Sequence, residues 1–323
     1  MSSKTQHRTC KYNRHTIFDL EKSASRSLLE HIIEEFGEEV DCENPAEPGS
    51  EFCIFHDPEL WRKDPGRVRR EFYKLLRQGK RCFIGYHLPG INLDEIERAA
   101  LGNLNLCLAK IHGDFVCRGK KFSKAVFIGT EFYGKADFTR TELIGEVSFN
   151  GARFHGETRF NNTRFRSHAS FVGAVFEDRV FFDNTIFNRK TEFFNTIFKG
   201  PVSFFKTSFQ GSVDFLSAEF NSAFFMYVTF YDHVSFLFSL FKKNAVFLSV
   251  SFNDIANFGY VTFCGSASFI ESFFNDCVDF TYIKFMGKDP DVIDFCYVRF
   301  ADPSKVFFIG SDLRNVSFLH NNY

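Results

Sequence analysis

Residues 125–176 read AVFIGTEFYGKADFTRTELIGEVSFNGARFHGETRFNNTRFRSHASFVGAVF. In this stretch a large apolar residue returns every five or six positions, and a small or β-branched residue stands two places before it each time. The pattern begins at Phe127 and continues to Phe318 over 35 such positions, of which 33 are Phe and two are Leu. A short repeat of this regularity determines a fold and leaves few positions free for an active site.

The spacing of the large residues predicts short extended segments joined by turns. A helical period of 3.6 does not fit, and the alternation that marks a continuous strand is interrupted in every unit. Within a unit the small residue and the Phe lie two positions apart, on the same side of an extended backbone, so both can point inward. Gly, Asn and Asp residues between the units allow the chain to turn. Four units then close one coil of about 22 residues, and coils stack about 4.8 Å apart.

The unit Ala136-Asp137-Phe138-Thr139-Arg140 is close to the consensus of the pentapeptide-repeat family, Ala-(Asp/Asn)-Leu/Phe-x-x, as are residues 152–156 and 185–189. The chain resembles a Phe-centred variant of this family in which spacings of five and six alternate. This resemblance covers residues 91–323 and implies an all-β fold, a right-handed quadrilateral β-helix with a small α-helical N-terminal cap. Longer spacings near the end predict protruding loops at residues 287–291 and 301–305.

The residues that precede the repeats have a different character. Apolar residues at helical spacing predict an amphipathic helix from Leu20 to Phe36 and a second helix from Arg67 to Leu76. We therefore expect three parts. They are a Cys/His element with the amphipathic helix (1–62), a helical cap or linker (63–90) and the β-helix (91–323).

Cysteine and histidine gather in the first of these parts. Cys53 and His56 form a Cys-x-x-His pair, which can place sulfur and imidazole on one metal ion, and Cys42 and Cys10 can complete the set. The stretch resembles a small zinc-binding element found ahead of the repeats in some prokaryotic pentapeptide-repeat proteins. Three Cys and one His leave no open position for water, so the predicted zinc site is structural. The alternative is that these residues are ordinary thiols and a surface histidine.

Composition and motifs argue against several functional classes. No apolar run approaches the ~18–20 residues of a membrane span, and no apolar stretch follows the basic N-terminus as in a secretory signal. Nine dispersed cysteines indicate reduced thiols and a cytoplasmic location. There is no Gly-rich phosphate loop and no Gly-x-Ser-x-Gly motif, and the histidines of the repeats have no nucleophile pattern beside them. We therefore expect this chain to have no enzymatic activity.

The charge of the repeats changes sign along the chain. Residues 120–206 contain 14 Lys and Arg against 9 Asp and Glu, whereas residues 207–323 contain 7 against 12. Some pentapeptide-repeat proteins mimic duplex DNA with an acidic rod and inhibit type II topoisomerases. The neutral repeat region as a whole supports that function poorly, although its acidic half offers a short mimic. Direct binding of nucleic acid is not expected at a net charge of −1.

Outward-facing apolar residues give the sharpest surface prediction. Residues 22 positions apart should stack on one wall of the coil, and exposed apolar patches commonly mark interfaces. We predict that one wall mediates self-association, for example as a homodimer, or binds a protein partner. Its residues are Phe194, Leu216, Leu237, Phe238, Tyr260 and Tyr282. The alternative is that these side chains fold over the coil corners and only extend the core.

The sequence thus predicts a non-enzymatic protein-interaction scaffold, a rigid rod that presents flat walls to a macromolecular partner or to itself. Two other functions remain open. One is a DNA mimic that inhibits a DNA-binding enzyme such as a type II topoisomerase. The other is a sensor that responds to zinc or to thiol oxidation at the N-terminal cysteines.

Overall fold

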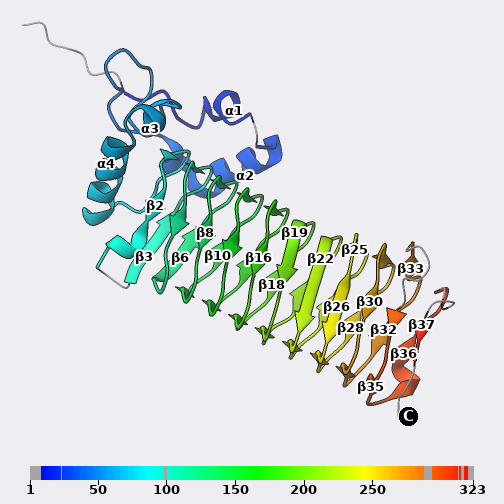
Figure 1. Cartoon of the computed structure of the whole chain (residues 1–323). Helices are drawn as coiled ribbons and strands as arrows, with labels where there is room; N and C mark the ends of the chain where they lie inside the picture. The colour runs from blue at the N-terminus through cyan, green and yellow to red at the C-terminus, as the bar shows by residue number, and fades with distance from the viewer. Residues whose placement is uncertain are drawn as a thin grey trace, which may run out of the picture.

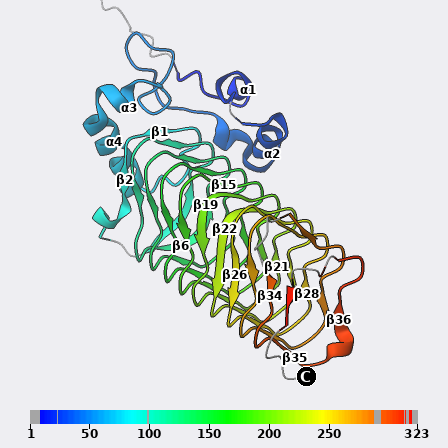
Figure 2. The same ribbon diagram turned by 45° about the vertical axis from the view of Figure 1, so that its right-hand side comes forward.

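The computed structural model describes residues 9–22, 24–97, 100–286, 293–311, 313 and 316–318. Helices gather at the N-terminal end, and a stack of short strands extends from them toward the C-terminal end (Figure 1). Turning the molecule shows the strands as closed coils stacked one behind another (Figure 2). The predicted all-β solenoid with a small helical N-terminal cap is confirmed.

Each coil contains four strand positions, which form four faces of parallel strands. Arg153 pairs with Glu131 in the preceding coil and with Val175 in the following coil, so the register repeats every 22 residues. About ten coils stack in this way. We number the faces 1 to 4 in the order in which the chain visits them. Strands β3 and β6 each run through faces 3 and 4, and β19 and β22 each run through faces 1 and 2.

The strands that belong to each face follow in chain order. Face 1 comprises β1 (His87–Leu88), β4 (Lys110–Ile111), β7 (Glu131–Phe132), β11 (Arg153–Phe154), β15 (Val175–Phe176), β19 (Ile197–Ser203), β22 (Glu219–Met226), β25 (Leu240–Phe241), β29 (Thr262–Phe263) and β33 (Lys284–Phe285). Face 2 contains parts of β19 and β22. Its other strands are β2 (Ile91–Asn92), β5 (Phe115–Val116), β8 (Ala136–Asp137), β12 (Thr158–Arg159), β16 (Val180–Phe181), β26 (Ala245–Leu248), β30 (Ala267–Ser268), β34 (Ile293–Asp294) and β37 (Val316–Ser317).

Faces 3 and 4 are built in the same manner. Face 3 comprises β3 (Ala100–Asn105), β6 (Lys121–Val126), β9 (Glu142–Leu143), β13 (Arg164–Phe165), β17 (Ile186–Phe187), β20 (Ser208–Phe209), β23 (Thr229–Phe230), β27 (Ser251–Phe252), β31 (Phe273–Phe274) and β35 (Arg299–Phe300). Face 4 contains parts of β3 and β6. Its other strands are β10 (Val147–Ser148), β14 (Ala169–Ser170), β18 (Thr191–Glu192), β21 (Val213–Asp214), β24 (Val234–Ser235), β28 (Ala256–Asn257), β32 (Val278–Asp279) and β36 (Val306–Phe307).

The repeated Phe side chains point inward and stack from coil to coil. The rings of Phe149 and Phe171 on face 4 lie 5.0 Å apart, and those of Phe160 and Phe182 on face 2 lie 4.9 Å apart. Each pair is nearly parallel, and all four side chains are fully buried. Burial of one such side chain contributes about 1.5–3 kcal/mol relative to exposure. The stacked Phe columns are therefore the main stabilising element of the solenoid.

Two of the four corners turn through a left-handed backbone conformation. The residue two places after the inward Phe of face 2 or face 4 has a positive φ, as at Asn162, Asn184 and Gly151. Only glycine adopts this conformation without strain, and Asn tolerates it better than most residues. This conformation explains the Gly and Asn residues that stand at these two corners, such as Gly129, Gly173 and Asn195. We call the corner between face 4 and face 1 the 4–1 corner.

One coil is a residue shorter than its neighbours. Phe220 and Phe225 are separated by five residues where the alternation would give six, and β22 runs through the corner without a turn. The pairing of β19 with β22 shifts register between Phe198 and Pro201. The Phe columns nevertheless continue, because the rings of Phe204 and Phe225 still stack at 4.7 Å. A corner can therefore lose a residue without disturbing the core.

The cap contains four helices. They are α1 (Ile17–Leu20), α2 (Arg26–Phe36), α3 (Leu60–Lys63) and α4 (Pro65–Arg77), with 3-10 turns η1 (Gly37–Val40) and η2 (Leu93–Glu95). The helix predicted from Leu20 begins at Arg26, because extended Ser25 caps it by accepting a hydrogen bond from the Leu28 N–H. The second predicted helix is present, capped by Asp64 through the Arg67 N–H. The first strand begins at His87, four residues before the predicted start of the β-helix.

Helix α2 packs on the N-terminal end of face 4. A β-carbon placed on Gly129 or on Gly151 would lie 3.3 Å from Leu28 Cδ2, so the helix approaches the 4–1 corner closely where that corner is glycine. Val126 and Ile128 occupy outward positions on face 4, yet they are only 4% and 2% exposed, because the cap covers this end of the face. The cap and the first coils thus share one apolar core.

The predicted loop at residues 287–291 lies outside the described residues. At the second predicted loop, the 3-10 turn η3 (Pro303–Lys305) interrupts the repeat between β35 and β36. Among the residues that the structure describes, none of the helices combines the length and the apolar character that a membrane span requires.

Candidate metal centre and exposed aromatic corner

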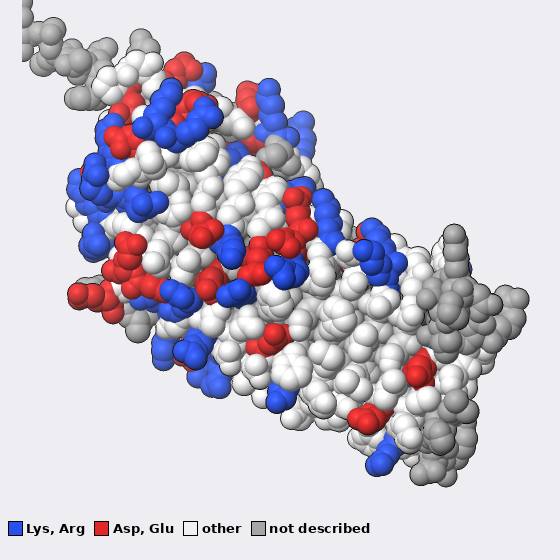
Figure 3. All heavy atoms as spheres, viewed as in Figure 1, with Lys and Arg blue, Asp and Glu red and all other residues white. Residues whose placement is uncertain are grey.

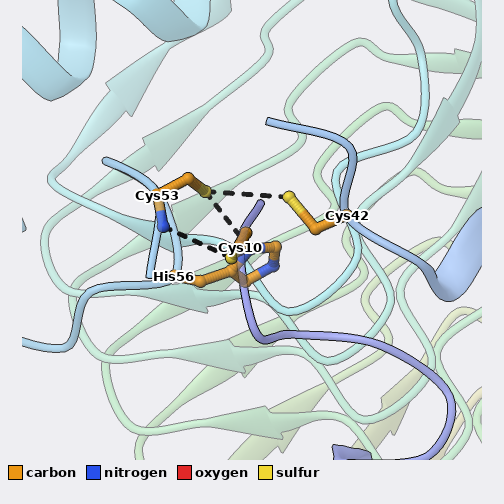
Figure 4. A group of neighbouring side chains, drawn as sticks. All are labelled: Cys10, Cys42, Cys53 and His56. Carbon is orange, nitrogen blue, oxygen red and sulfur yellow. Dashed lines mark hydrogen bonds between the residues drawn. The ribbon is translucent and has the colours of Figure 1, made fainter. Parts of the chain in front are cut away.

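Three segments of the cap bring the predicted metal ligands together. The segment that carries Cys10 lies beside the segment after Cys42, because the Cys10 N–H donates to the Asn44 carbonyl at 3.0 Å. Cys53 and His56 stand at the two ends of one tight turn, in which the His56 N–H donates to the Cys53 carbonyl at 3.1 Å. The four side chains converge on one point (Figure 4).

The separations of the ligand atoms fit a tetrahedral site. All four lie within 4.8 Å of one another. The Sγ atoms of Cys42 and Cys53 are 3.7 Å apart, and His56 Nδ1 lies 3.4 Å from the Sγ atoms of Cys10 and of Cys53. Tetrahedral zinc with its usual bond lengths separates two sulfurs by roughly 3.8 Å and a sulfur from a nitrogen by roughly 3.5 Å. A disulfide would need about 2.05 Å, so the cysteines are free thiols in an arrangement that can hold a metal ion.

Neighbouring groups orient the ligands. His56 Nε2–H donates to the Ile84 carbonyl at 2.9 Å, which leaves Nδ1 facing the cysteines. Asn44 Nδ2 donates to Cys42 Sγ at 3.3 Å and to the Tyr86 hydroxyl at 2.9 Å. Hydrogen bonds of this kind fix the tautomer and the direction of metal ligands in proteins. The group is therefore prearranged by the fold of the cap.

Burial and mutual hydrogen bonding perturb the protonation of the group. Hydrogen bonds with Cys42 and Cys53 hold the pKa of Cys10 well below its ordinary value, whereas hydrogen bonds with Cys10 and Cys42 raise the pKa of Cys53. Burial alone would lower the pKa of His56, but hydrogen bonds with Cys10 and Cys42 outweigh it and raise that pKa to about 9. A metal ion competes with protons for these same sulfur and nitrogen atoms.

The residues of the predicted interaction wall occupy two different places. Phe238, Tyr260 and Tyr282 lie in successive coils on the 4–1 corner, where their rings follow one another at 5.1 and 4.9 Å. They are 54%, 45% and 46% exposed. All three have a positive φ, so three bulky residues hold a backbone conformation that favours glycine. The positive φ is common to residues at this place of the repeat, and the exposure of the three rings sets them apart from the buried Phe columns.

The other residues of the predicted wall lie on face 4 itself. Phe194, Leu216 and Leu237 each follow an inward Phe and are half-buried. The opposite face 2 carries half-buried apolar residues at the same place in the repeat, including Leu248. In the view of Figure 3, charged side chains gather on the cap and the first coils, and the C-terminal half of this side is largely uncharged.

A stack of rings on face 1 was missed by sequence reasoning. Trp61 of α3 lies on His112, with 3.6 Å between the ring centroids, and Tyr133 and His155 continue the stack at 5.1 and 4.6 Å. His87 Nδ1 is 3.2 Å from His112 Nε2. The histidines are therefore partnered, although no catalytic pattern surrounds them in sequence. The 21- and 22-residue spacings of His112, Tyr133 and His155 carried a signal, but nothing in the repeat points to Trp61.

Residues 121–164 match the family model described as "Pentapeptide repeats (9 copies)". The matched segment starts with β6 and ends at the start of β13, within the regular part of the solenoid. The resemblance inferred from the repeat is thereby confirmed. No curated protein matches the chain.

Proposed function

We propose that this chain, a solenoid of pentapeptide repeats, is a non-enzymatic scaffold that presents face 4 and the 4–1 corner to a protein partner. The observation that carries the proposal is the row of exposed aromatic side chains at Phe238, Tyr260 and Tyr282. The row stands on coils whose inward Phe side chains are fully buried. Exposed apolar patches commonly mark protein interfaces, and large aromatic residues dominate the binding energy of such interfaces.

The test of the scaffold is site-specific photo-crosslinking in cells. A photoreactive phenylalanine at position 260 is compared with the same residue at position 231, because Tyr231 is equally exposed but lies on face 3. We expect one defined macromolecule to crosslink at position 260 and not at position 231. Equal crosslinking at both positions, or none at either, would overturn the proposal.

The proposal includes one structural zinc ion in the cap. Three thiols and one imidazole form a closed set of four soft ligands, which is the donor set that zinc prefers in structural sites. Such an ion would link Cys10, Cys42 and the Cys53–His56 turn, and would hold the cap against the first coil. All nine cysteines are free of disulfides, which supports a reducing compartment such as the cytoplasm.

Elemental analysis of the purified protein tests the zinc. We expect about one zinc per chain, and none after Cys53→Ala. The matched control is Cys264→Ala, because Cys264 lies in a distant coil of the solenoid and should leave the metal content unchanged. A metal-free protein from zinc-supplemented cells would remove this part of the proposal.

A DNA mimic is the second candidate, and one observation favours it. Asp232, Asp254 and Asp276 lie in successive coils along the corner between faces 3 and 4. One charge per coil step of ~4.8 Å is about a third of the charge density of duplex DNA, which carries one charge per ~1.7 Å. Lys305 also pairs with Asp276 at 2.8 Å. Inhibition of a type II topoisomerase, abolished by changing these three Asp residues to Asn, would favour the mimic over the scaffold.

A further inference from the structure

We propose that the open part of face 4 binds an amphipathic α-helix of a partner protein, with Lys or Arg residues along one flank of that helix. The inference rests on the proposed scaffold function and names the class of partner. The surface in question, called here the open strip, begins where α2 ends. It consists of half-buried Val172, Phe194, Leu216 and Leu237 and of the aromatic corner residues Phe238, Tyr260 and Tyr282.

Helix α2 is a segment of this chain that already packs on face 4. The helix covers the outward residues Val126 and Ile128 of the first coils, and its Leu28 contacts the glycines of the 4–1 corner. Seven residues further along, on the same side of the helix, Glu35 forms an ion pair of 3.7 Å with Lys124, at the corner between faces 3 and 4. Helix α2 therefore reaches across the N-terminal end of face 4, with an apolar side chain at one corner and a charged side chain at the other.

The open strip continues the same surface. Val172, Phe194, Leu216 and Leu237 follow Ile128 at the same place of the repeat, two to five coils further along the chain. From Val172 to Tyr282 the strip spans five coil steps, or about 24 Å. A helix of about 16 residues has that length at 1.5 Å per residue. The strip therefore offers the length and the apolar character that one helix requires.

The charge of the flank changes sign along the strip. At the corner between faces 3 and 4, Lys124 is the partner of Glu35 in α2. The same corner carries Arg166, Arg189 and Lys190 beside Val172 and Phe194, whereas Asp232, Asp254 and Asp276 follow beside Leu237 and the aromatic corner residues. Asp276 also pairs with Lys305 at 2.8 Å. A helix on the open strip would meet carboxylates in its C-terminal coils, and its flank would carry Lys or Arg there, because like charges across a contact are unfavourable.

The aromatic corner residues form the other side of the strip. Where α2 docks, the 4–1 corner is Gly129 and Gly151, and a helix can approach the backbone closely. In the open strip the same corner carries Phe238, Tyr260 and Tyr282 at positive φ and about half exposed. Bulky residues at positive φ also occur on the other left-handed corner, as at Tyr227 and Tyr297. The three residues of the strip differ from these because they occupy successive coils and their rings follow one another at 5.1 and 4.9 Å. They provide a continuous apolar contact area for a helix of the partner.

The test uses a synthetic helix derived from α2. Residues 24–40 are made with Glu35, Glu38 and Glu39 replaced by Lys and with a staple between the exposed positions 30 and 34. Fluorescence anisotropy then measures binding of this basic peptide and of the native acidic sequence to the full chain. We expect the basic peptide to bind about tenfold more tightly or better. Changing Asp232, Asp254 and Asp276 to Asn should remove that preference.

Three variants separate the strip from the rest of the surface. Leu237→Asp should weaken binding of the basic peptide about tenfold, whereas Leu248→Asp, at the equivalent place on face 2, should leave it unchanged. Tyr260→Asn, which suits the left-handed corner, should also weaken binding while the fold is kept. No binding at about 100 µM peptide, or equal loss with Leu248→Asp, would overturn the inference.

The two proposals fail in different ways. If the basic peptide does not bind but position 260 still crosslinks a partner, the scaffold stands and its partner belongs to another class. If the basic peptide does not bind and position 260 crosslinks no partner, the scaffold function is overturned as well.

Discussion

Trp61 lies flat on His112, with ring centroids 3.6 Å apart and an angle of 5° between the planes. This contact joins helix α3 of the cap to β4 of the solenoid, and His87 supports it through a hydrogen bond with His112. Burial and the nearby charge of Lys110 lower the pKa of His87 to about 3 and that of His112 to about 4. Both histidines are therefore neutral at physiological pH.

Acidification should weaken this attachment. In the unfolded chain each histidine binds a proton below pH ~6.5, whereas in the folded protein protonation is delayed to about pH 3 to 4. The unfolded state therefore binds more protons in the window between about pH 4 and 6.5, and the free energy of unfolding falls as the pH falls through that window. Each unit of pKa shift corresponds to ~1.4 kcal/mol. Emission of Trp61, the single tryptophan, should shift to the red as the contact opens.

His112→Phe provides the control for this prediction. The substitution keeps a ring beneath Trp61 but removes one titrating group and the hydrogen-bond partner of His87. We expect the fluorescence transition of the variant to move to lower pH. An unchanged transition would assign the acid response to carboxylates elsewhere in the chain.

Gly151 should tolerate alanine less well than Gly173, the next residue on the 4–1 corner. Both glycines have φ near +65°, so an added β-carbon strains each backbone by a similar ~1–2 kcal/mol. Only at Gly151 does the β-carbon also approach Leu28 of α2, since Gly173 has open space around it. Hydrogen exchange of α2 should therefore increase in Gly151→Ala and not in Gly173→Ala. Equal exchange in the two variants would contradict the close packing of α2 on this corner.

A Phe in the core should matter far more to stability than an aromatic residue on the corner. Phe182 is fully buried between Phe160 and Phe204, and its replacement by alanine should lower the free energy of unfolding by ~3–5 kcal/mol. Tyr260→Asn loses ring contacts but relieves a strained φ, so the net change should stay within about 1 kcal/mol. Urea denaturation followed by circular dichroism measures both. A large loss of stability in Tyr260→Asn would show that Tyr260 serves the fold and not the binding of a partner.

Removal of the proposed zinc ion should loosen the cap and spare the solenoid. Chelation, or Cys53→Ser, takes away the link between the three ligand segments, and stability supplied by a bound metal is lost with it. We expect proteolysis within residues 9–60 to accelerate, while the β-sheet signal of the coils persists. Cys264→Ser should behave as the wild type. Resistance of the cap to protease after complete chelation would show that hydrogen bonds alone hold it.

Much of the fold was predictable from the amino-acid sequence because its determinant is local. Phe149 and Phe171 are 22 residues apart, and that spacing alone places one ring on the other. The grouping of three cysteines and one histidine was also predictable from residue types, including Cys10, although 31 residues separate it from Cys42. The backbone pairing that carries Cys10 to Asn44 explains how this distance is bridged.

Other features depend on packing between distant segments and could not be predicted. The start of α2 at Arg26 follows from capping by Ser25, which competes with the apolar periodicity that extends further back. The contact of Trp61 with His112 requires the cap to lie on face 1, which no repeat specifies. The division of the predicted wall into a face and a corner depends on the positive φ of Tyr260, and periodicity does not report backbone dihedral angles.

The 22-residue register of the regular coils makes the solenoid a molecular ruler. From Gly151, where α2 docks, to Tyr260 the 4–1 corner advances by five coils, or about 24 Å. Deletion of residues 173–194 would remove one coil, keep every later residue on its own face, and bring the aromatic corner one step nearer to the cap. Duplication of the same segment would move it one step away. The gain or loss of 22 codons can thus change the distance between the two ends of the molecule by one coil. Neither end needs to be redesigned for this change.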